Sequence, residues 1–559
     1  MATWPLFLTP VYKHYKFLVL SIYRSKNKKM KNYFFKYLIG RLNICHSFSK
    51  MTNFERLIEE RLSLFKKYIN HTGLDPKQYQ YEGVRWILNN ELRPSPIHGV
   101  RGGFIADEMG LGKTIMMIGT FLCNFLERTL IVVPPVLVNQ WYVQIYKTTG
   151  HKALIYHGEE KKNITLDHLN KAKIVITTYG AVTINKKQMK NKVLTMLHEV
   201  KWSRLVFDEA HHLRNSKTTR FISAKLLSSR IRWLVSGTPV QNRKEDFYSL
   251  CSMLRLPRGF YTESVNLREL ARAFILKRTK KQVGIIMTDV VLDKNMVCWN
   301  NRKEMELSQE IHSALAFSRV SAHKGVNGIV STLEGRGILQ LFLTARQSCI
   351  LPKLMAQRLG SLVNLGLLKD ISSYREALNG TSKLDSVAKA ILERKGNGCG
   401  KLIFCHFREE IDEIASRLRA GGMTRVASFD GRTSGGKRVD ILNDKNEALI
   451  LQIQTGCEGL NLQENYSEIY FISPHWNPAV EDQAIARCHR IGQTKPVMVQ
   501  RFEMCSFAPN EEDQEDQDQQ DQDQKDQDQK QGTITIEKYV ESVQDMKRYI
   551  ACECVEPEV

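Results

Sequence analysis

The segment GFIADEMGLGKT (residues 103–114) places a glycine-rich loop between a short apolar run and an amphipathic run. A strand before such a loop and a helix after it are the context in which the loop binds phosphate, because backbone N–H groups and the helix N-terminus point at the anion. Lys113 is expected at the terminal phosphates and Thr114 at a Mg²⁺ ion. The expected nucleotide contacts are Asp107, Glu108, Met109, Gly110, Leu111, Gly112, Lys113 and Thr114. Asp107 stands where the generic motif has glycine.

Two adjacent carboxylates end the apolar run LVFDEAH (residues 205–211), 95 residues after Lys113. Asp208 is expected to hold Mg²⁺, and Glu209 is expected to orient and deprotonate an attacking water. His211 is a candidate for coupling this site to a second domain. Small hydroxyl residues in the segment 236–242 suit a polar relay at the end of another strand.

Around these segments the chain alternates short apolar strands with helices, which predicts parallel sheets covered by helices, the α/β class. The region 280–380 between two such runs is expected to be mostly helical. The strands are expected at 103–106, 129–133, 174–177, 205–207 and 233–236 in the first run, and at 401–405, 426–429, 448–453, 469–472 and 497–502 in the second.

The 559 residues carry a net charge of +22, which favours a polyanionic partner, most simply nucleic acid. Residues 1–50 hold ten Lys/Arg and no acidic residue, whereas the low-complexity Asp/Gln tract at 511–531 is acidic and is expected to be disordered. The tract is either an acidic decoy for the basic cleft or a tolerated loop expansion. Residues 1–50 are an organelle-targeting leader, a basic arm on nucleic acid or a poorly ordered extension before Met51.

The 12 cysteines are scattered without a CxxC pair, so neither a disulfide framework nor a zinc site is indicated and a reducing compartment is the natural interpretation. No apolar run is long enough to cross a membrane. We expect a first lobe at 51–279, a helical linker or protrusion at 280–380 and a second lobe at 381–559.

Further segments accompany the phosphate loop and the carboxylate pair in a fixed order, namely 79–86, 130–135, 139–141, 176–180, 276–280, 401–407, 429–431, 454–462, 476–478 and 483–493. The set resembles the Swi/Snf-type family of superfamily-two helicase-like DNA-dependent ATPases over residues 74–547. The family itself carries Asp at the position of Asp107. Cys457 departs from its usual paired glycines, which puts the detail of that loop in doubt.

The resemblance implies two tandem RecA-like lobes, with doubly wound parallel sheets, that use ATP and Mg²⁺ and bind double-stranded DNA across a basic groove. It implies that Gln80 contacts the adenine, that Gln483 also lies at the nucleotide, and that Arg490 is the arginine finger with Arg487 as its companion. Their spacing of three would place both arginines on one helix face. The implied nucleic-acid contacts are Asn139, Gln140, Trp141, Thr455, Asn461, Trp476 and Asn477, with core packing as the alternative for the tryptophans.

The function expected from the resemblance is an ATP-dependent double-stranded-DNA translocase that remodels or displaces bound proteins, such as nucleosomes, in a chromatin, transcription or repair role. The alternatives are a strand-separating DNA or RNA helicase and a non-catalytic DNA-binding scaffold. DNA as the substrate suggests the nucleus, or the replication compartment of a large DNA virus.

Overall fold

The computed structural model of the chain describes residues 52–72, 77–191, 193–237, 243–315, 335–364, 374–433, 435–456, 460–507 and 534–555. The N-terminal extension and the Asp/Gln tract of the sequence analysis lie outside these residues, as do positions 238–242 and 457–459. The residues up to Pro76 form a unit separate from Lys77–Val559. Its helix α3 (Asn53–Thr72) carries Ile58, Leu62, Phe65 and Ile69 at helical spacing, so these residues share one face.

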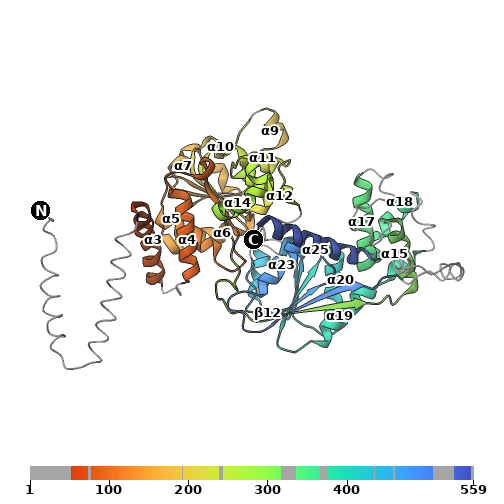
Figure 1. Ribbon diagram of the computed structural model, residues 1–559. Coiled ribbons are helices and arrows are strands. Elements are labelled where there is room, and N and C mark those ends of the chain that lie inside the picture. Colours follow the sequence, from red (N-terminus) through yellow and green to blue (C-terminus); the bar gives the residue numbers. More distant parts are fainter. Residues whose placement is uncertain are drawn as a thin grey trace, which may run out of the picture. The chain divides into compact units, whose positions relative to one another are not determined.

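A seven-stranded sheet forms the centre of the first lobe (Figure 1). Its strands are β1 (Arg101–Ile105), β2 (Thr129–Val133), β3 (Leu154–Tyr156), β4 (Ile174–Thr178), β5 (Trp202–Asp208), β6 (Ser229–Val235) and β7 (Ile275–Leu276). They pair in the order β3-β4-β2-β5-β6-β1-β7, and all the pairs are parallel. Parallel pairing brings the carboxyl ends of β1 and β5 to the same edge of the sheet, with only β6 between them.

The helices of the first lobe precede β1 or occupy the connections between these strands. They are α4 (Gln78–Leu92), α5 (Lys113–Cys123), α6 (Val138–Thr149), α7 (Leu166–Lys171), α8 (Tyr179–Val182), α9 (Lys186–Lys190), α10 (Met196–Glu199), α11 (Thr219–Leu226), α12 (Lys244–Met253), α13 (Arg258–Thr262) and α14 (Leu267–Phe274). Single 3₁₀ turns are η1 (Ile97–Gly99), η2 (Pro135–Leu137), η3 (Glu160–Asn163), η4 (Ala210–Leu213) and η5 (Ser264–Asn266).

A second parallel sheet of six strands follows. Its strands are β8 (Val290–Val297), β9 (Gly400–Cys405), β10 (Val426–Phe429), β11 (Ala448–Gln452), β12 (Tyr466–Phe471) and β13 (Val497–Met504), in the order β10-β11-β9-β12-β13-β8. The expected fold class of two parallel-sheet α/β lobes is confirmed. The region expected to be mostly helical also contains one strand, β8, which the sequence did not predict. It pairs with β13 over its whole length although almost 200 residues separate the two strands.

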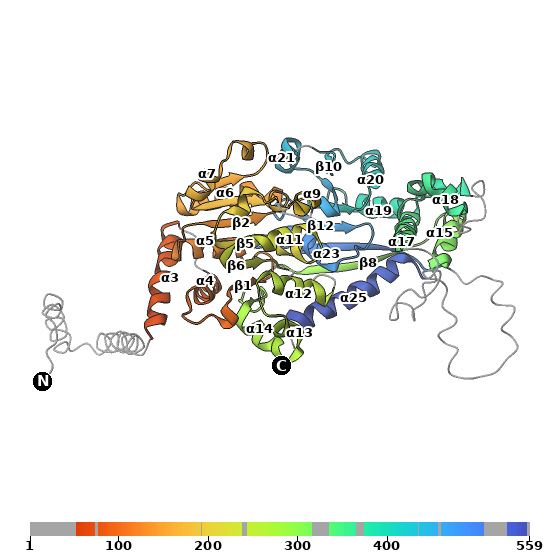
Figure 2. The ribbon, with the colours of Figure 1, turned by 90° about the horizontal axis from the view of Figure 1, so that it is seen from above.

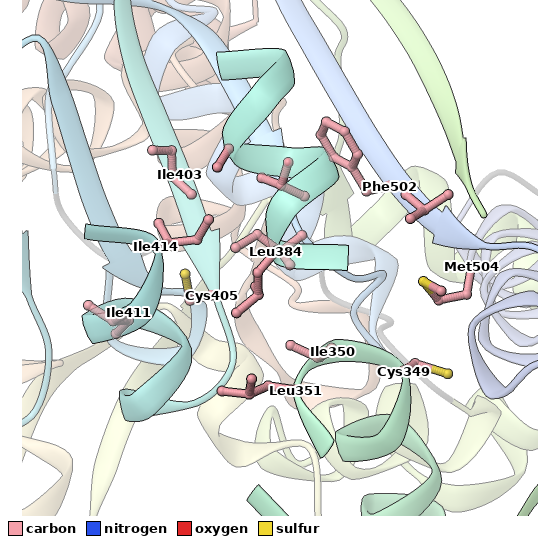
Figure 3. Close-up of a cluster of buried hydrophobic side chains, with 14 of the residues drawn as sticks. Cys349, Ile350, Leu351, Leu384, Ile403, Cys405, Ile411, Ile414, Phe502 and Met504 are labelled. Carbon is pink, nitrogen blue, oxygen red and sulfur yellow. The ribbon is translucent and has the colours of Figure 1, made fainter. Parts of the chain in front are cut away.

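The helices around the second sheet are α15 (Arg302–Leu315), α17 (Gly335–Ile350), α18 (Leu359–Asn364), α19 (Ser382–Glu393), α20 (Arg408–Ala420), α21 (Gly435–Asn443), α22 (Ile453–Gly456), α23 (Pro478–Cys488) and α25 (Ile536–Val555), with the 3₁₀ segments η7 (Pro352–Arg358) and η9 (Ala377–Asn379). Successive residues of β9 point to opposite faces of the sheet, as the strand period of two requires. Ile403 and Cys405 therefore belong to one buried cluster (Figure 3), and Leu402 and Phe404 to another.

The C-terminal helix α25 contacts both lobes. Near its start, Ile536 and Val540 are buried in the core of the second lobe, and near its end Ile550 and Ala551 pack against the core of the first. Figure 2 shows α25, in dark blue, running from the neighbourhood of α17 to that of α12, and it contacts both helices. The lobes are thus connected at a second place besides the chain between β7 and β8. No described helix is long and apolar enough to span a membrane.

Candidate nucleotide site

The loop between β1 and α5 has the backbone that phosphate binding needs. Gly110 and Gly112 have φ values of 93° and 80°, a left-handed region that favours glycine. Lys113 is the first residue of α5, and its Nζ donates hydrogen bonds to the carbonyl oxygens of Asp107 (2.7 Å) and Glu108 (3.3 Å). Gln80 lies against the same loop, because its Nε2 donates to the Leu111 carbonyl at 3.5 Å.

The acidic residues of this loop are held by a segment far along the chain. Asp107 is fully buried, and Arg278 donates to both of its carboxylate oxygens, from Nε at 3.1 Å and from Nη2 at 2.5 Å. Glu108 accepts from the backbone N–H of Lys280 at 2.7 Å and pairs with its Nζ at 3.1 Å. The carboxylate of Asp107 is therefore engaged inside the protein.

At the end of β5, both carboxylates reach the same cavity as Lys113. The indole Nε1 of Trp141 donates to Asp208 Oδ2 at 2.7 Å, and the backbone N–H of Glu209 donates to Asp208 Oδ1 at 3.0 Å. Glu209 has a φ of 49°, unusual for a residue other than glycine, and such conformations cluster at functional sites. Its Oε2 lies 3.3 Å from His211 Nδ1.

Burial and proximity separate the pKa values of these two carboxyl groups. Burial, together with the charge of Glu209, raises the pKa of Asp208 to about 7. Burial alone would also raise the pKa of Glu209, but His211, Lys113 and Arg487 outweigh it and lower that pKa to about 2. Burial lowers the pKa of Lys113, although the nearby carboxylates oppose this effect. Adjacent groups with opposite shifts are characteristic of functional sites.

Two arginines of the second lobe line this cavity of about 240 Å³. Arg487 is 5 % exposed, and its Nη1 donates to the Leu460 carbonyl at 3.4 Å. Arg490 Nη1 donates to Asn461 Oδ1 at 2.8 Å, and burial beside Arg487 lowers the pKa of Arg490 to about 10. The expectation that the two arginines share a helix face was wrong, because α23 ends at Cys488 and Arg490 follows it in an irregular segment. Both side chains nevertheless line one cavity.

The residues present fit a magnesium ion. Thr114, Asp208 and Glu209 line one cavity, and hydroxyl and carboxylate oxygens are the ligands that Mg²⁺ prefers. Burial and the charge of Glu209 disfavour the ionised form of Asp208 and raise its pKa, and a nearby cation would compensate for both effects. Bound Mg²⁺ would supply that compensation.

A second cavity, of about 500 Å³, lies next to the first and is also lined by both lobes. His211 and Arg214 of the first lobe face Gln454, His475 and Gln483 of the second across it. Gln483 was expected at the nucleotide, but the structure places it in this second cavity and not among the residues around Lys113. Ser236 Oγ lies 3.5 Å from His211 Nδ1, so a hydroxyl does adjoin the carboxylate site.

The expected nucleic-acid residues divide into two groups, and the two tryptophans form the first. Trp141 is 1 % exposed and bonded to Asp208, which favours core packing for this residue. Trp476 is half-buried and packs edge-on to Phe342 at 5.5 Å, so part of its side chain remains accessible.

The remaining candidates are polar. Asn139 is exposed, Gln140 is exposed at the rim of the first cavity, and Asn461 binds Arg490. Asn477 is 7 % exposed and caps α23 through the backbone N–H of Ala479. The backbone of Thr455 belongs to α22.

Sequence reasoning assigned no roles to Arg278 and Lys280. They lie in the segment 276–280, which was noted only as one of the segments that accompany the phosphate loop. Lys280 is 5 % exposed, and its Nζ also donates to the His489 carbonyl at 3.2 Å, so it joins the phosphate loop to the segment that leads into Arg490. The only available signal in the sequence was the basic segment KRTKK (residues 277–281), which directly follows an apolar run.

The protein has two lobes built on parallel sheets. One lobe carries a phosphate loop and paired carboxylates, and the other carries two arginines. This combination defines the class of helicase-like ATPases. Family models agree with this assignment: residues 79–262 match the SNF2-related domain, and residues 382–492 match the helicase conserved C-terminal domain. The chain belongs to the SNF2-related family of helicase-like ATPases.

Several curated proteins are similar over about three quarters of the chain. The DNA excision repair protein ERCC-6-like of Danio rerio is 26% identical and matches 78% of this chain and 35% of its own length. The ATP-dependent DNA helicase DDM1 of Arabidopsis thaliana is 26% identical, with shares of 77% and 59%. The chain thus spans only a third to three fifths of the length of these relatives.

A viral relative and a solved structure were also found. The probable global transactivator of Orgyia pseudotsugata multicapsid polyhedrosis virus is 26% identical over 76% of this chain and 85% of its own. The solved structure is the Sulfolobus solfataricus SWI2/SNF2 ATPase core in complex with dsDNA, at 22% identity and a TM-score of 0.34, covering 77% of this chain and 88% of that chain.

Proposed function

We propose that the protein is an ATP-dependent double-stranded-DNA translocase, in which ATP hydrolysis is coupled to closure of the two lobes. The observation that carries this proposal is that Arg487 and Arg490 of the second lobe line the cavity of Lys113, Asp208 and Glu209 of the first. An active site assembled from both lobes acts only when they close, so the chemistry is tied to a motion.

Each residue has a distinct task in this proposal. Lys113 exchanges its carbonyl partners for the terminal phosphates of ATP, and the loop backbone binds the remaining phosphate oxygens. Glu209, ionised at neutral pH, orients the attacking water and accepts its proton. Arg490 leaves Asn461 and, with Arg487, stabilises the charge that develops on the γ-phosphoryl group. Mg²⁺, when held by Thr114 and Asp208, neutralises part of the phosphate charge.

We assign the nucleic-acid contacts to polar residues that bind phosphates. The net charge of +22 and the exposed positions of Asn139 and Asn461 support backbone binding without sequence preference. Affinity should then fall steeply as the salt concentration rises. The names of the DNA repair, DNA helicase and viral transactivator relatives favour a role in remodelling protein–DNA complexes and a nuclear or viral replication site.

The test is the rate of ATP hydrolysis by the purified chain alone and with duplex DNA, single-stranded DNA or RNA. Strong stimulation by duplex DNA is expected, followed by displacement of a protein roadblock. Preferential stimulation by single strands, with unwinding of a tailed duplex, would favour a strand-separating helicase instead. DNA binding without turnover under any condition would favour a non-catalytic scaffold.

A further inference from the structure

Two cysteines meet at the ends of neighbouring strands, away from the nucleotide cavity. Cys298 directly follows β8 and Cys505 directly follows β13, one step beyond the last registered pair, Val297 and Met504. Their Sγ atoms are 3.8 Å apart. The register continues between them, because the backbone N–H of Cys505 donates to the Val297 carbonyl at 2.9 Å.

This placement satisfies the geometric requirement of a disulfide. Neighbouring strands lie about 4.7–4.9 Å apart, and the two Cα atoms of a disulfide are usually about 4.4–6.8 Å apart. Bond formation therefore requires the two Sγ atoms to approach each other by about 1.8 Å, which side-chain rotation can supply without displacing the strands. The backbone of Cys505 is also held by the residue after Cys298, because Trp299 Nε1 donates to the Cys505 carbonyl at 3.2 Å.

Access distinguishes this pair from the other cysteines whose side chains the structure describes. Cys298 is exposed and Cys505 is half-buried. Burial, and then the neighbouring Cys298 thiol, raise the pKa of Cys505. Cys298 is the more exposed thiol, so a dissolved disulfide reaches it first. The others are Cys399, which is half-buried, and a buried set consisting of Cys123, Cys251, Cys349, Cys405 and Cys488.

We propose that Cys298 and Cys505 form a reversible oxidation site, which closes to a disulfide when a small-molecule disulfide such as oxidised glutathione is the oxidant. The Cys298 thiolate attacks one sulfur of oxidised glutathione, forming a mixed disulfide and releasing one glutathione thiolate, which takes up a proton. Cys505 then loses its proton to solvent and attacks Cys298 Sγ, releasing the second glutathione. Two electrons pass from the cysteine pair to glutathione, and excess reduced glutathione reverses both steps.

The disulfide would fasten an edge strand. β8 is one of the two edge strands of this sheet, with a sheet partner on one side only, and is the first strand after the chain leaves the first lobe. The bond would join positions 207 residues apart and hold the end of β8 to β13. Its formation depends on the strand pairing alone and not on the proposed ATPase activity.

The experiment incubates the folded, full chain with oxidised glutathione and digests it with trypsin without reduction. The expected product is the peptide 295–302 linked to the peptide 502–525, at the summed mass minus two hydrogen atoms. The Cys298→Ser and Cys505→Ser variants should lose this product, and the matched Cys399→Ser variant should retain it. In hydrogen exchange, the amides of β8 should be more protected in the oxidised chain than in the reduced chain.

Three results would overturn the proposal. One is glutathione that remains on Cys298 as a stable mixed disulfide. Another is linkage of Cys298 to Cys505 only after unfolding in urea, and the third is unchanged exchange of the β8 amides after quantitative linkage.

Discussion

Replacing Trp141 by phenylalanine should change how Asp208 titrates. The indole Nε1 is 2.7 Å from Asp208 Oδ2, and the side chain is 1 % exposed. Phenylalanine retains most of the buried ring and removes the hydrogen bond. The ionised carboxylate depends on that bond more than the protonated carboxyl does, and the pKa of Asp208 should therefore rise further above about 7.

The size of the effect follows from the strength of the bond. A hydrogen bond to a charged group contributes about 1.5–3 kcal/mol. Since one pKa unit corresponds to about 1.36 kcal/mol, the pKa of Asp208 should rise by about 1 to 2 units. A protonated Asp208 is a poor ligand for Mg²⁺, so the affinity for the magnesium–nucleotide complex should fall at neutral pH and recover as the pH rises.

The assay is the pH dependence of kcat/KM for ATP at sub-saturating Mg²⁺, with duplex DNA present. In the unaltered protein the rate should fall as the pH is lowered through about 7, because Asp208 takes up a proton. The Trp141→Phe variant should show the same fall at a pH about 1 to 2 units higher. Excess Mg²⁺ should bring the two profiles together, because the metal competes with the proton.

Trp202→Phe is the matched control. Trp202 lies at the other end of β5, is 3 % exposed and donates to the Leu197 carbonyl at 2.9 Å, so this variant loses an equally buried indole bond without touching Asp208. The reasoning would be refuted if Trp141→Phe lowered the rate equally at every pH, or if both variants moved the profile alike. Either result would show that Trp141 acts only through packing.

Three further predictions concern other contacts. Glu209→Gln should abolish ATP turnover and leave nucleotide binding within a few-fold, measured by fluorescence titration; unchanged turnover would rule out Glu209 as the base. Lys280→Met should lower kcat about 10- to 100-fold with little change in KM, because it removes a charge-assisted bond to His489, in the segment before Arg490; a change in KM alone would contradict this. Glu91→Gln should destabilise the first lobe by about 3–5 kcal/mol, because Arg204 is buried against it with both side chains 0 % exposed. Hydrogen exchange of the β5 amides measures this loss, and a loss below about 1 kcal/mol would mean that Arg204 finds another partner.

The sequence was sufficient for features in which neighbouring residues determine the outcome. Apolar runs followed by glycines or carboxylates located the strands, the phosphate loop and the positions of Lys113, Asp208 and Glu209. It was insufficient where distant residues meet. Arg278 and Asp107 are 171 residues apart and β8 pairs with a strand almost 200 residues later, and no local period encodes either contact.

Trp141 shows why a residue type alone does not determine the role of a side chain. Trp141 follows exposed polar residues, so its position in the sequence suits a surface contact equally well. Helix α6 nevertheless turns Trp141 inward and its predecessor Gln140 outward, because consecutive residues of a helix point about 100° apart. The partner of the indole, Asp208, comes from a strand 67 residues later and becomes visible only in the folded chain.

The two connections between the lobes have a mechanical consequence. A body attached to another at a single point can turn in any direction, whereas two separate attachments leave one easy rotation, about the line that joins them. The chain between β7 and β8 is one attachment and α25 is the other, anchored by Ile536 and Val540 at one end and by Ile550 and Ala551 at the other. Points far from that line travel furthest for a given rotation. Under the proposed translocase function, the distance moved along DNA in one closure would therefore depend on how far the DNA-binding residues lie from this axis.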